Sequence, residues 1–232
     1  MREVIFDTET TGLNPLSGDR MVEIGCVEIY NRVETGRHFH AYFNPDRDMP
    51  FEAEAVHGLS AIFLSDKPRF SEKVEELLEF IADSPLVAHN AGFDFGFLNF
   101  ELERCGRPRV CNTRMVDTLT LARSRHPGAK HSLDALCMRF GIDRSHRVKH
   151  GALLDAQLLA QVYVELTGGR QIGLGLVADT DRLRVDAGSG TVKVREPRIA
   201  RPHYAHSEEL ERHRAFIAKL VNPLWARFAE AG

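Results

Sequence analysis

The chain has 232 residues and a formal net charge of -3, and 43% of its residues are hydrophobic. Its length allows one domain of ordinary size plus an appendage, and its hydrophobic content is sufficient for a real core. It contains no run of about 18 apolar residues and no basic-then-apolar leader. We therefore expect a cytoplasmic protein without a membrane span or a secretory signal.

The cysteines and the charges give two further constraints. Cys26, Cys105, Cys111 and Cys137 are scattered, without a CxxC pair or zinc-ligand spacing, so we expect reduced thiols that lie mostly in the core. Acidic residues predominate in residues 1–169, whereas Lys and Arg outnumber Asp and Glu in residues 170–232. This asymmetry indicates two regions rather than any particular partner.

The first part of the chain reads as strands followed by a helix. Apolar runs and partial alternation predict three N-terminal strands, over residues 4–6, 21–30 and 38–43. Ser71 is expected to cap an amphipathic helix that follows them. A short buried strand is then predicted over residues 86–88.

Helices and strands alternate from there to residue 169. We expect a helix over residues 93–105 that Gly106 ends, and a strand over residues 115–119. Ser132 is expected to cap a helix that Gly141 ends, and residues 152–167 form the last strong helix of this part. Three strands followed by alternating helices and strands predict an α/β fold, with a mixed sheet flanked by helices.

The stretch FDTETTG places Asp7 and Glu9 two residues apart, directly after the apolar run of residues 4–6. In a strand, such positions point to the same face, with Cα atoms about 7 Å apart. The two carboxylates repel each other unless a cation lies between them, and hard oxygen ligands suit magnesium or manganese. The alternative is a solvated acidic strand end, because short motifs have many chance matches.

Two later segments carry further candidate groups. His89-Asn90-Ala91-Gly92-Phe93-Asp94 follows a predicted buried strand and places Asp94 in the first turn of a helix, where the helix dipole alone would favour it. His150 precedes Gly151, and Asp155 lies one turn into the next helix. Taken alone, His150 could equally be a surface histidine of the basic loop over residues 144–149.

Taken together and in this order, these three segments resemble the three exonuclease motifs of the DEDDh family, in which the fold is ribonuclease H-like. The segment Val56-His57-Gly58-Leu59 also resembles the part of that family that contacts substrate. The resemblance covers nearly all of residues 1–169, and it implies a mixed five-stranded sheet and a metal-dependent 3'-5' exonuclease. Within the family, the chain is most similar to the proofreading subunits of bacterial replicative polymerases.

The resemblance also implies roles for individual residues. Asp7, Glu9 and Asp155 would hold two divalent ions, Mg²⁺ or Mn²⁺, with Asp94 completing the acidic set and His150 acting as general base. The product would be a nucleoside 5'-monophosphate released from a 3' end. The residues implied to hold the terminal nucleotide are Asp7, Thr8, Glu9, Thr10, Gly12, Leu13, Glu52, His57, Phe93 and Asp155. A merely structural role remains open for Glu52 and Phe93.

The remainder of the chain suggests partners. Residues 170–206 read as a flexible linker, and Gln171, Leu174 and Leu176 resemble peptides that bind the sliding clamp, although ordinary linker is the alternative. Residues 207–232 contain an amphipathic segment that resembles the part of such subunits that docks on the polymerase alpha subunit. The alternative there is packing back onto residues 1–169.

Two other functions share these motifs. An exonuclease that trims RNA 3' ends would need neither the clamp-like nor the polymerase-docking segment. A non-catalytic adaptor between clamp and polymerase would have no physical reason to retain a repulsive acidic cluster. We therefore expect a proofreading exonuclease that removes mispaired 3'-terminal nucleotides from DNA.

Overall fold

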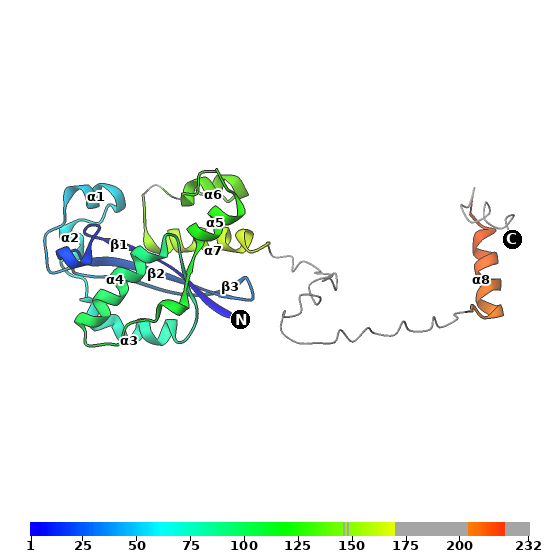
Figure 1. Ribbon diagram of the computed structural model, residues 1–232, viewed down its shortest axis with the longest axis horizontal. Coiled ribbons are helices and arrows are strands. Elements are labelled where there is room, and N and C mark those ends of the chain that lie inside the picture. Colours follow the sequence, from blue (N-terminus) through cyan, green and yellow to red (C-terminus); the bar gives the residue numbers. More distant parts are fainter. Residues whose placement is uncertain (146, 148, 170–203, 221–232) are drawn as a thin grey trace, which may run out of the picture. The chain divides into compact units, whose positions relative to one another are not determined.

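The computed structural model describes residues 1–145, 147, 149–169 and 204–220 (Figure 1). The predicted clamp-binding residues Gln171, Leu174 and Leu176 lie outside the described residues, as does most of the predicted linker. No helix in the described part of the chain is long and apolar enough to cross a membrane.

A five-stranded mixed sheet, in the order β3-β2-β1-β4-β5, forms the centre of the fold. Its strands are β1 (Arg2–Thr10), β2 (Met21–Tyr30), β3 (Val33–Tyr42), β4 (Leu86–Ala88) and β5 (Met115–Asp117). The three N-terminal strands β1, β2 and β3 pair antiparallel, and β1, β4 and β5 pair parallel. β1 is thus the middle strand.

Helices cover both faces of this sheet (Figure 1). They are α1 (Phe51–His57), α2 (Ala61–Leu64), α3 (Phe70–Ile81), α4 (Ala91–Arg104), α5 (Thr118–Arg125), α6 (Leu133–Phe140) and α7 (Ala152–Leu166). Because side chains alternate along a strand, neighbouring residues of β1 enter different cores. Phe6 packs with residues of α3 and α4 and meets Phe95 edge to face at 5.7 Å, whereas Ile5 packs with Ala156 and Leu159 of α7.

The predicted boundaries match α6, and they match α7 to within one residue, whereas α3 and α4 begin earlier than predicted and α4 ends at Arg104. Ser132 caps α6 and Gly141 ends it, as predicted. α3, in contrast, begins at Phe70, and the Glu72 side chain accepts a hydrogen bond from the Arg69 backbone N at 2.7 Å, so Ser71 is not the cap. Phe70 is the first residue of α3, and its side chain is buried in the core.

The predicted strand over residues 115–119 is also wrong at its end. β5 ends at Asp117, whose side chain caps α5 by accepting from the Leu119 backbone N at 3.0 Å. α5 was not expected, and neither were α1 and α2, which are too short to show a helical period. The prediction of mostly core thiols holds for Cys26 and Cys137, whereas Cys111 is exposed.

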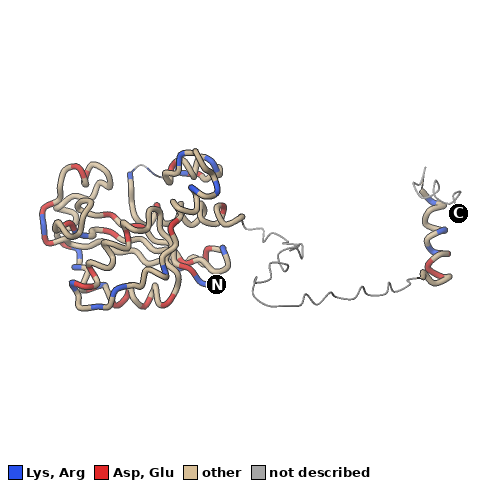
Figure 2. The backbone as a smooth tube through the Cα atoms, in the orientation of Figure 1, with Lys and Arg blue, Asp and Glu red and all other residues tan. Residues whose placement is uncertain are grey.

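α8 (Ser207–Ile217) is the only described element of the predicted docking segment, and it is considered by itself. Figure 2 shows that acidic residues lie at its start and basic residues further along. Glu208 and Glu209 lie in its first turn and Arg214 in its last, which suits the helix dipole. Leu210 and Phe216 are 44% and 59% exposed, so this helix carries apolar surface in contact with solvent.

Candidate active site

Asp7 and Glu9 lie inside β1 rather than at its end, because the strand continues to Thr10. On one side they are paired with β2, where Asp7 faces Gly25 and Glu9 faces Glu23. On the other side, β4 pairs with β1 at residues 4 and 5. The sheet therefore opens next to the two carboxylates, and their edge of β1 is available to other groups.

Gly25 allows α7 to approach this part of the sheet. A Cβ atom at Gly25 would lie 2.3 Å from both the backbone N and the Cα of Leu153, closer than real Cβ contacts occur. The first turn of α7 therefore lies directly on β2, and it carries Asp155, which is 3% exposed. Because Gly25 has no side chain, α7 can lie against β2, and its Asp155 carboxylate comes close to the carboxylates of β1.

Asp94 reaches the site from the first turn of α4. Thr8 Oγ1 donates a hydrogen bond to Asp94 Oδ1 at 2.7 Å, which ties α4 to β1 between the two strand carboxylates. The start of α4 is held by Asp117, which accepts from the backbone N atoms of Asn90 and Ala91 at 3.0 and 3.3 Å. Asp117 therefore organises the starts of both α4 and α5.

Burial raises the pKa values of Asp7, Glu9 and Asp94, and neighbouring carboxylates add to the effect. Burial and the nearby charges of Asp94, Glu9 and Asp155 raise the pKa of Asp7 well above its usual range. Burial, Glu23 and Asp155 raise the pKa of Glu9 to about 8, and burial raises that of Asp94 to about 7 despite its hydrogen bond from Thr8. A divalent cation among these carboxylates would lower the raised pKa values, because it stabilises the charged forms.

A divalent cation fits this group of residues. One ligand atom each from Glu9, His150 and Asp155 lies within 4.8 Å of the others. Carboxylate oxygens suit hard cations, and imidazole is a ligand for several divalent metals. Asp7 and Asp94 are not part of this set of three as the side chains stand, although their charges act on it.

Arg147 lies among these groups, and sequence reasoning noted it only as one member of a basic loop. Its Nε and Nη2 atoms donate to Oδ1 and Oδ2 of Asp155 at 2.5 and 2.8 Å. Nη2 also lies 2.8 Å from Nδ1 of His150, which is 3.3 Å from Asp155 Oδ2. Nothing in the local sequence distinguishes Arg147 from Arg144, so only the fold could have identified it.

A cavity of about 470 Å³ lies beside the carboxylates. Eight of the ten residues predicted to hold a nucleotide line it, namely Thr8, Glu9, Thr10, Gly12, Leu13, Glu52, His57 and Phe93. The other two, Asp7 and Asp155, line an adjoining cavity of about 520 Å³ with Arg147 and His150. The carboxylates thus stand between a pocket of nucleotide size and a second opening.

His57 offers a hydrogen-bond donor to the first cavity. The Leu59 backbone N donates to His57 Nδ1 at 3.0 Å, which places the ring proton on Nε2. Nε2 is buried and makes no hydrogen bond of ordinary geometry within the described residues, although the Thr10 backbone lies near enough to act on the ring. Burial lowers the pKa of His57, which favours the neutral ring.

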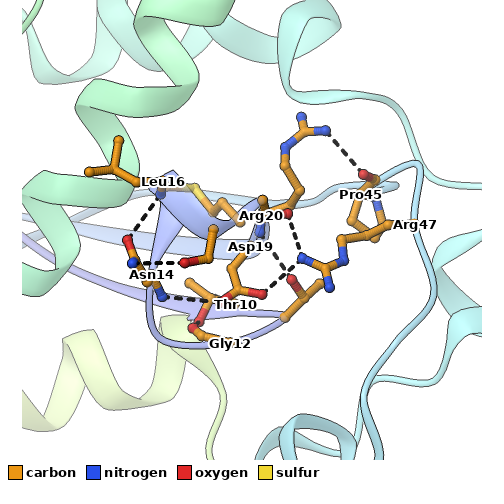
Figure 3. Close-up of polar contacts among 12 residues, drawn as sticks. Thr10, Gly12, Asn14, Leu16, Asp19, Arg20, Pro45 and Arg47 are labelled. Carbon is orange, nitrogen blue, oxygen red and sulfur yellow. Dashed lines mark hydrogen bonds and ion pairs between the residues drawn. The ribbon is translucent and has the colours of Figure 1, made fainter.

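The loop between β1 and β2 forms one wall of that cavity, and a polar network holds it (Figure 3). Asp19 accepts from the Asn14 backbone N at 3.0 Å and from Arg47 at 2.8 Å. The Asp19 carboxylate lies so close to Gly12 that a Cβ there would be 2.3 Å from Oδ2. Gly12 is therefore needed for space, and the Asp19–Arg47 pair fixes the wall.

Comparison with known proteins agrees with this geometry. A family model described as exonuclease matches residues 4–163. A DNA polymerase III subunit epsilon of Rickettsia typhi is 49% identical over 227 residues, covering 95% of this chain and 97% of that protein. The corresponding Escherichia coli subunit is 42% identical over 225 residues, covering 92% and 91%.

Solved structures share the fold. Exonuclease X in complex with 5' overhanging duplex DNA aligns with a TM-score of 0.54 at 26% identity, covering 71% of this chain and 90% of that one. The nuclease domain of 3'hExo, a DEDDh family member bound to rAMP, aligns with a TM-score of 0.62 at 15% identity, covering 72% and 91%, and supports the fold alone. The fold is ribonuclease H-like, and the chain belongs to the exonuclease family and, within it, to the DNA polymerase III epsilon subunits.

Proposed function

We propose that this chain is the proofreading 3'-5' exonuclease of a bacterial DNA polymerase III, which removes mispaired 3'-terminal nucleotides from DNA. The observation that carries the proposal is the meeting of four carboxylates and a histidine beside a cavity of about 470 Å³. The relatives' names support DNA rather than RNA as the substrate.

Asp7, Glu9 and Asp155, with Asp94 beside them, are the proposed holders of two divalent ions, Mg²⁺ or Mn²⁺. When bound, such ions supply positive charge that stabilises the attacking and leaving oxygens of a phosphodiester displacement. The same carboxylates would repel a phosphate if their charge were not offset, which the raised pKa values of Asp7 and Glu9 illustrate.

His150 is the proposed general base, which takes a proton from the attacking water. It is half exposed and stands directly before α7, next to Asp155. An imidazole suits this role because its unperturbed pKa lies near neutral pH. The product is then a nucleoside 5'-monophosphate.

The cavity would hold the terminal nucleotide. Phe93 offers a ring that can pack against a base or sugar, and the buried Nε2–H of His57 offers a donor to an oxygen of the nucleotide. The backbone of residues 8–13 supplies the wall that the Asp19–Arg47 pair holds.

We also infer which partners this chain binds. We assign the segment over residues 207–232 to docking on the alpha subunit, and Gln171, Leu174 and Leu176, which lie outside the described residues, to the sliding clamp. Exposed Leu210 and Phe216 on α8 support the docking role. Action on chromosomal DNA places the protein in the cytoplasm.

The test is hydrolysis of a 3'-mismatched DNA primer in magnesium, compared with a short RNA of the same sequence. Asp7→Ala and Asp155→Ala should abolish hydrolysis without unfolding the protein, and His150→Ala should lower the rate by about 10² to 10⁴. Wild-type rates in these variants would refute the residue assignment. Faster hydrolysis of RNA than of DNA, with and without the alpha subunit, would favour the RNA-trimming function.

A further inference from the structure

Arg147 is bound to Asp155 by a two-pronged charged contact. Both Asp155 oxygens accept from the guanidinium, at 2.5 and 2.8 Å, and the side chains of Arg147 and Asp155 are only 9% and 4% exposed. The planar guanidinium fork matches the geometry of a carboxylate, which makes such contacts stronger than single ones. Both oxygens of a proposed metal ligand are therefore engaged by a cation.

The same guanidinium also engages the proposed base. Nη2 of Arg147 lies 2.8 Å from Nδ1 of His150, and a guanidinium has only donors, so Nδ1 is the acceptor. One nitrogen of Arg147 thus contacts both Asp155 and His150. These are two of the three residues whose ligand atoms lie within 4.8 Å of one another.

Arg147 also offsets part of the negative charge of the site. It opposes the effect of Glu23, Asp155 and Asp94 on Glu9, because its charge lowers the pKa that they raise. Asp155, Asp134 and Asp7 in turn raise the pKa of Arg147. The guanidinium therefore supplies part of the positive charge that the carboxylates require.

We propose that Arg147 is an internal counter-cation, which holds Asp155 and His150 in the metal-free protein and is displaced when a divalent ion binds. This inference rests on the proposed metal-dependent function. A carboxylate oxygen that binds a divalent ion directly becomes a weaker acceptor for a guanidinium, and two cations at one site repel each other. Metal binding then frees the ligand Asp155 and the base His150 in one step.

Asp134 is a second partner that Arg147 can keep after it leaves Asp155. It accepts from Arg147 Nη1 at 3.0 Å and from Arg144 Nη1 at 2.9 Å, and its side chain is 45% exposed. Arg147 can therefore release Asp155 while keeping a partner at the rim of the site. Within the described residues Arg144 shares that partner and makes no contact with Asp155 or His150, so it is a matched control.

In the experiment, the full-length chain is stripped of metal with EDTA and then titrated with MnCl₂ alone. Binding is measured by calorimetry and by the electron paramagnetic resonance signal of free Mn²⁺. Arg147→Gln and Arg147→Ala should bind Mn²⁺ about tenfold more tightly than the wild type, because the competitor is gone and the unpaired carboxylates gain more from the ion. Arg144→Gln should change the affinity by less than about twofold, as expected for a half-exposed ion pair.

A second readout covers variants that fold poorly without metal. MnCl₂ should raise the melting temperature of Arg147→Gln by more than that of the wild type, since tighter binding to the folded state stabilises it more. Equal or weaker Mn²⁺ binding by Arg147→Gln would overturn the inference, because Arg147 would then orient Asp155 for the metal. A wild type that binds no Mn²⁺ would contradict the proposed function itself, and the inference with it.

Discussion

At the scale of single residues, Glu9 and Asp94 link the site to the stability of the fold. The pKa of Glu9 is raised from 4.5 to about 8 and that of Asp94 from 3.8 to about 7, so both bind protons more tightly in the folded chain than in the unfolded one. At pH values between the unfolded pKa and the folded pKa of each carboxyl, the unfolded state binds fewer protons than the folded state. Stability of the metal-free protein should therefore fall as pH rises from about 5 to about 8, by up to about 1.4 kcal/mol per pH unit for each such carboxyl.

Thermal unfolding in EDTA at a series of pH values measures this dependence. Glu9→Gln should flatten the decline, because an amide does not titrate, and should melt at a higher temperature than the wild type near pH 8. Saturating MgCl₂ should also flatten it by offsetting the charge. A melting temperature that rises from pH 5 to pH 8 in EDTA would show that the carboxylates are already compensated.

At the scale of elements, the contact between α7 and β2 decides whether the site assembles. Gly25→Ala places a methyl group against the backbone of Leu153 and Ala152, which cannot move without shifting the whole helix. We expect a loss of about 1–3 kcal/mol or more in the free energy of unfolding, as in other overpacked cores. Exonuclease activity should also fall, because Asp155 moves with α7.

Gly96 in α4 provides the control for this substitution. A Cβ at Gly96 meets nothing within 4 Å, and the position is helical. Gly96→Ala should be neutral or stabilising by up to about 1 kcal/mol. Urea unfolding and primer hydrolysis of both variants make the comparison, and equal stability of the two variants would mean that α7 is not seated on Gly25 as described.

At the scale of the whole molecule, the catalytic and docking parts should separate. Every proposed catalytic group lies in residues 7–155, and α7 ends at Leu166. A chain that ends at Gly169 should retain hydrolysis of the mismatched primer and lose co-purification with the alpha subunit. If the truncated chain still co-purifies, docking belongs to residues 1–169 and α8 has another role.

The acidic residues could be picked out from the sequence on physical grounds, and the family resemblance joined them into one site. Charge repulsion makes Asp7 and Glu9 conspicuous in a strand, and helix starts make Asp94 and Asp155 easy to place. Arg147 and Gly25 could not be foreseen, because each matters only through a residue that the fold brings against it, Asp155 for Arg147 and Leu153 for Gly25. The short helices α1 and α2 were not predicted for a different reason, because four to seven residues are too few to show a helical hydrophobic period.

The central strand β1 and the loop before α7 should differ in how easily they open. β1 is the middle strand and carries Asp7 and Glu9, so their backbone amides should exchange with solvent only when the whole domain unfolds. His150 and Arg147 stand outside the helices and strands, where local opening is cheaper. The protein can therefore lose its base while its acidic pair stays in place, so that loss of activity on mild heating leaves a folded domain that still presents two carboxylates.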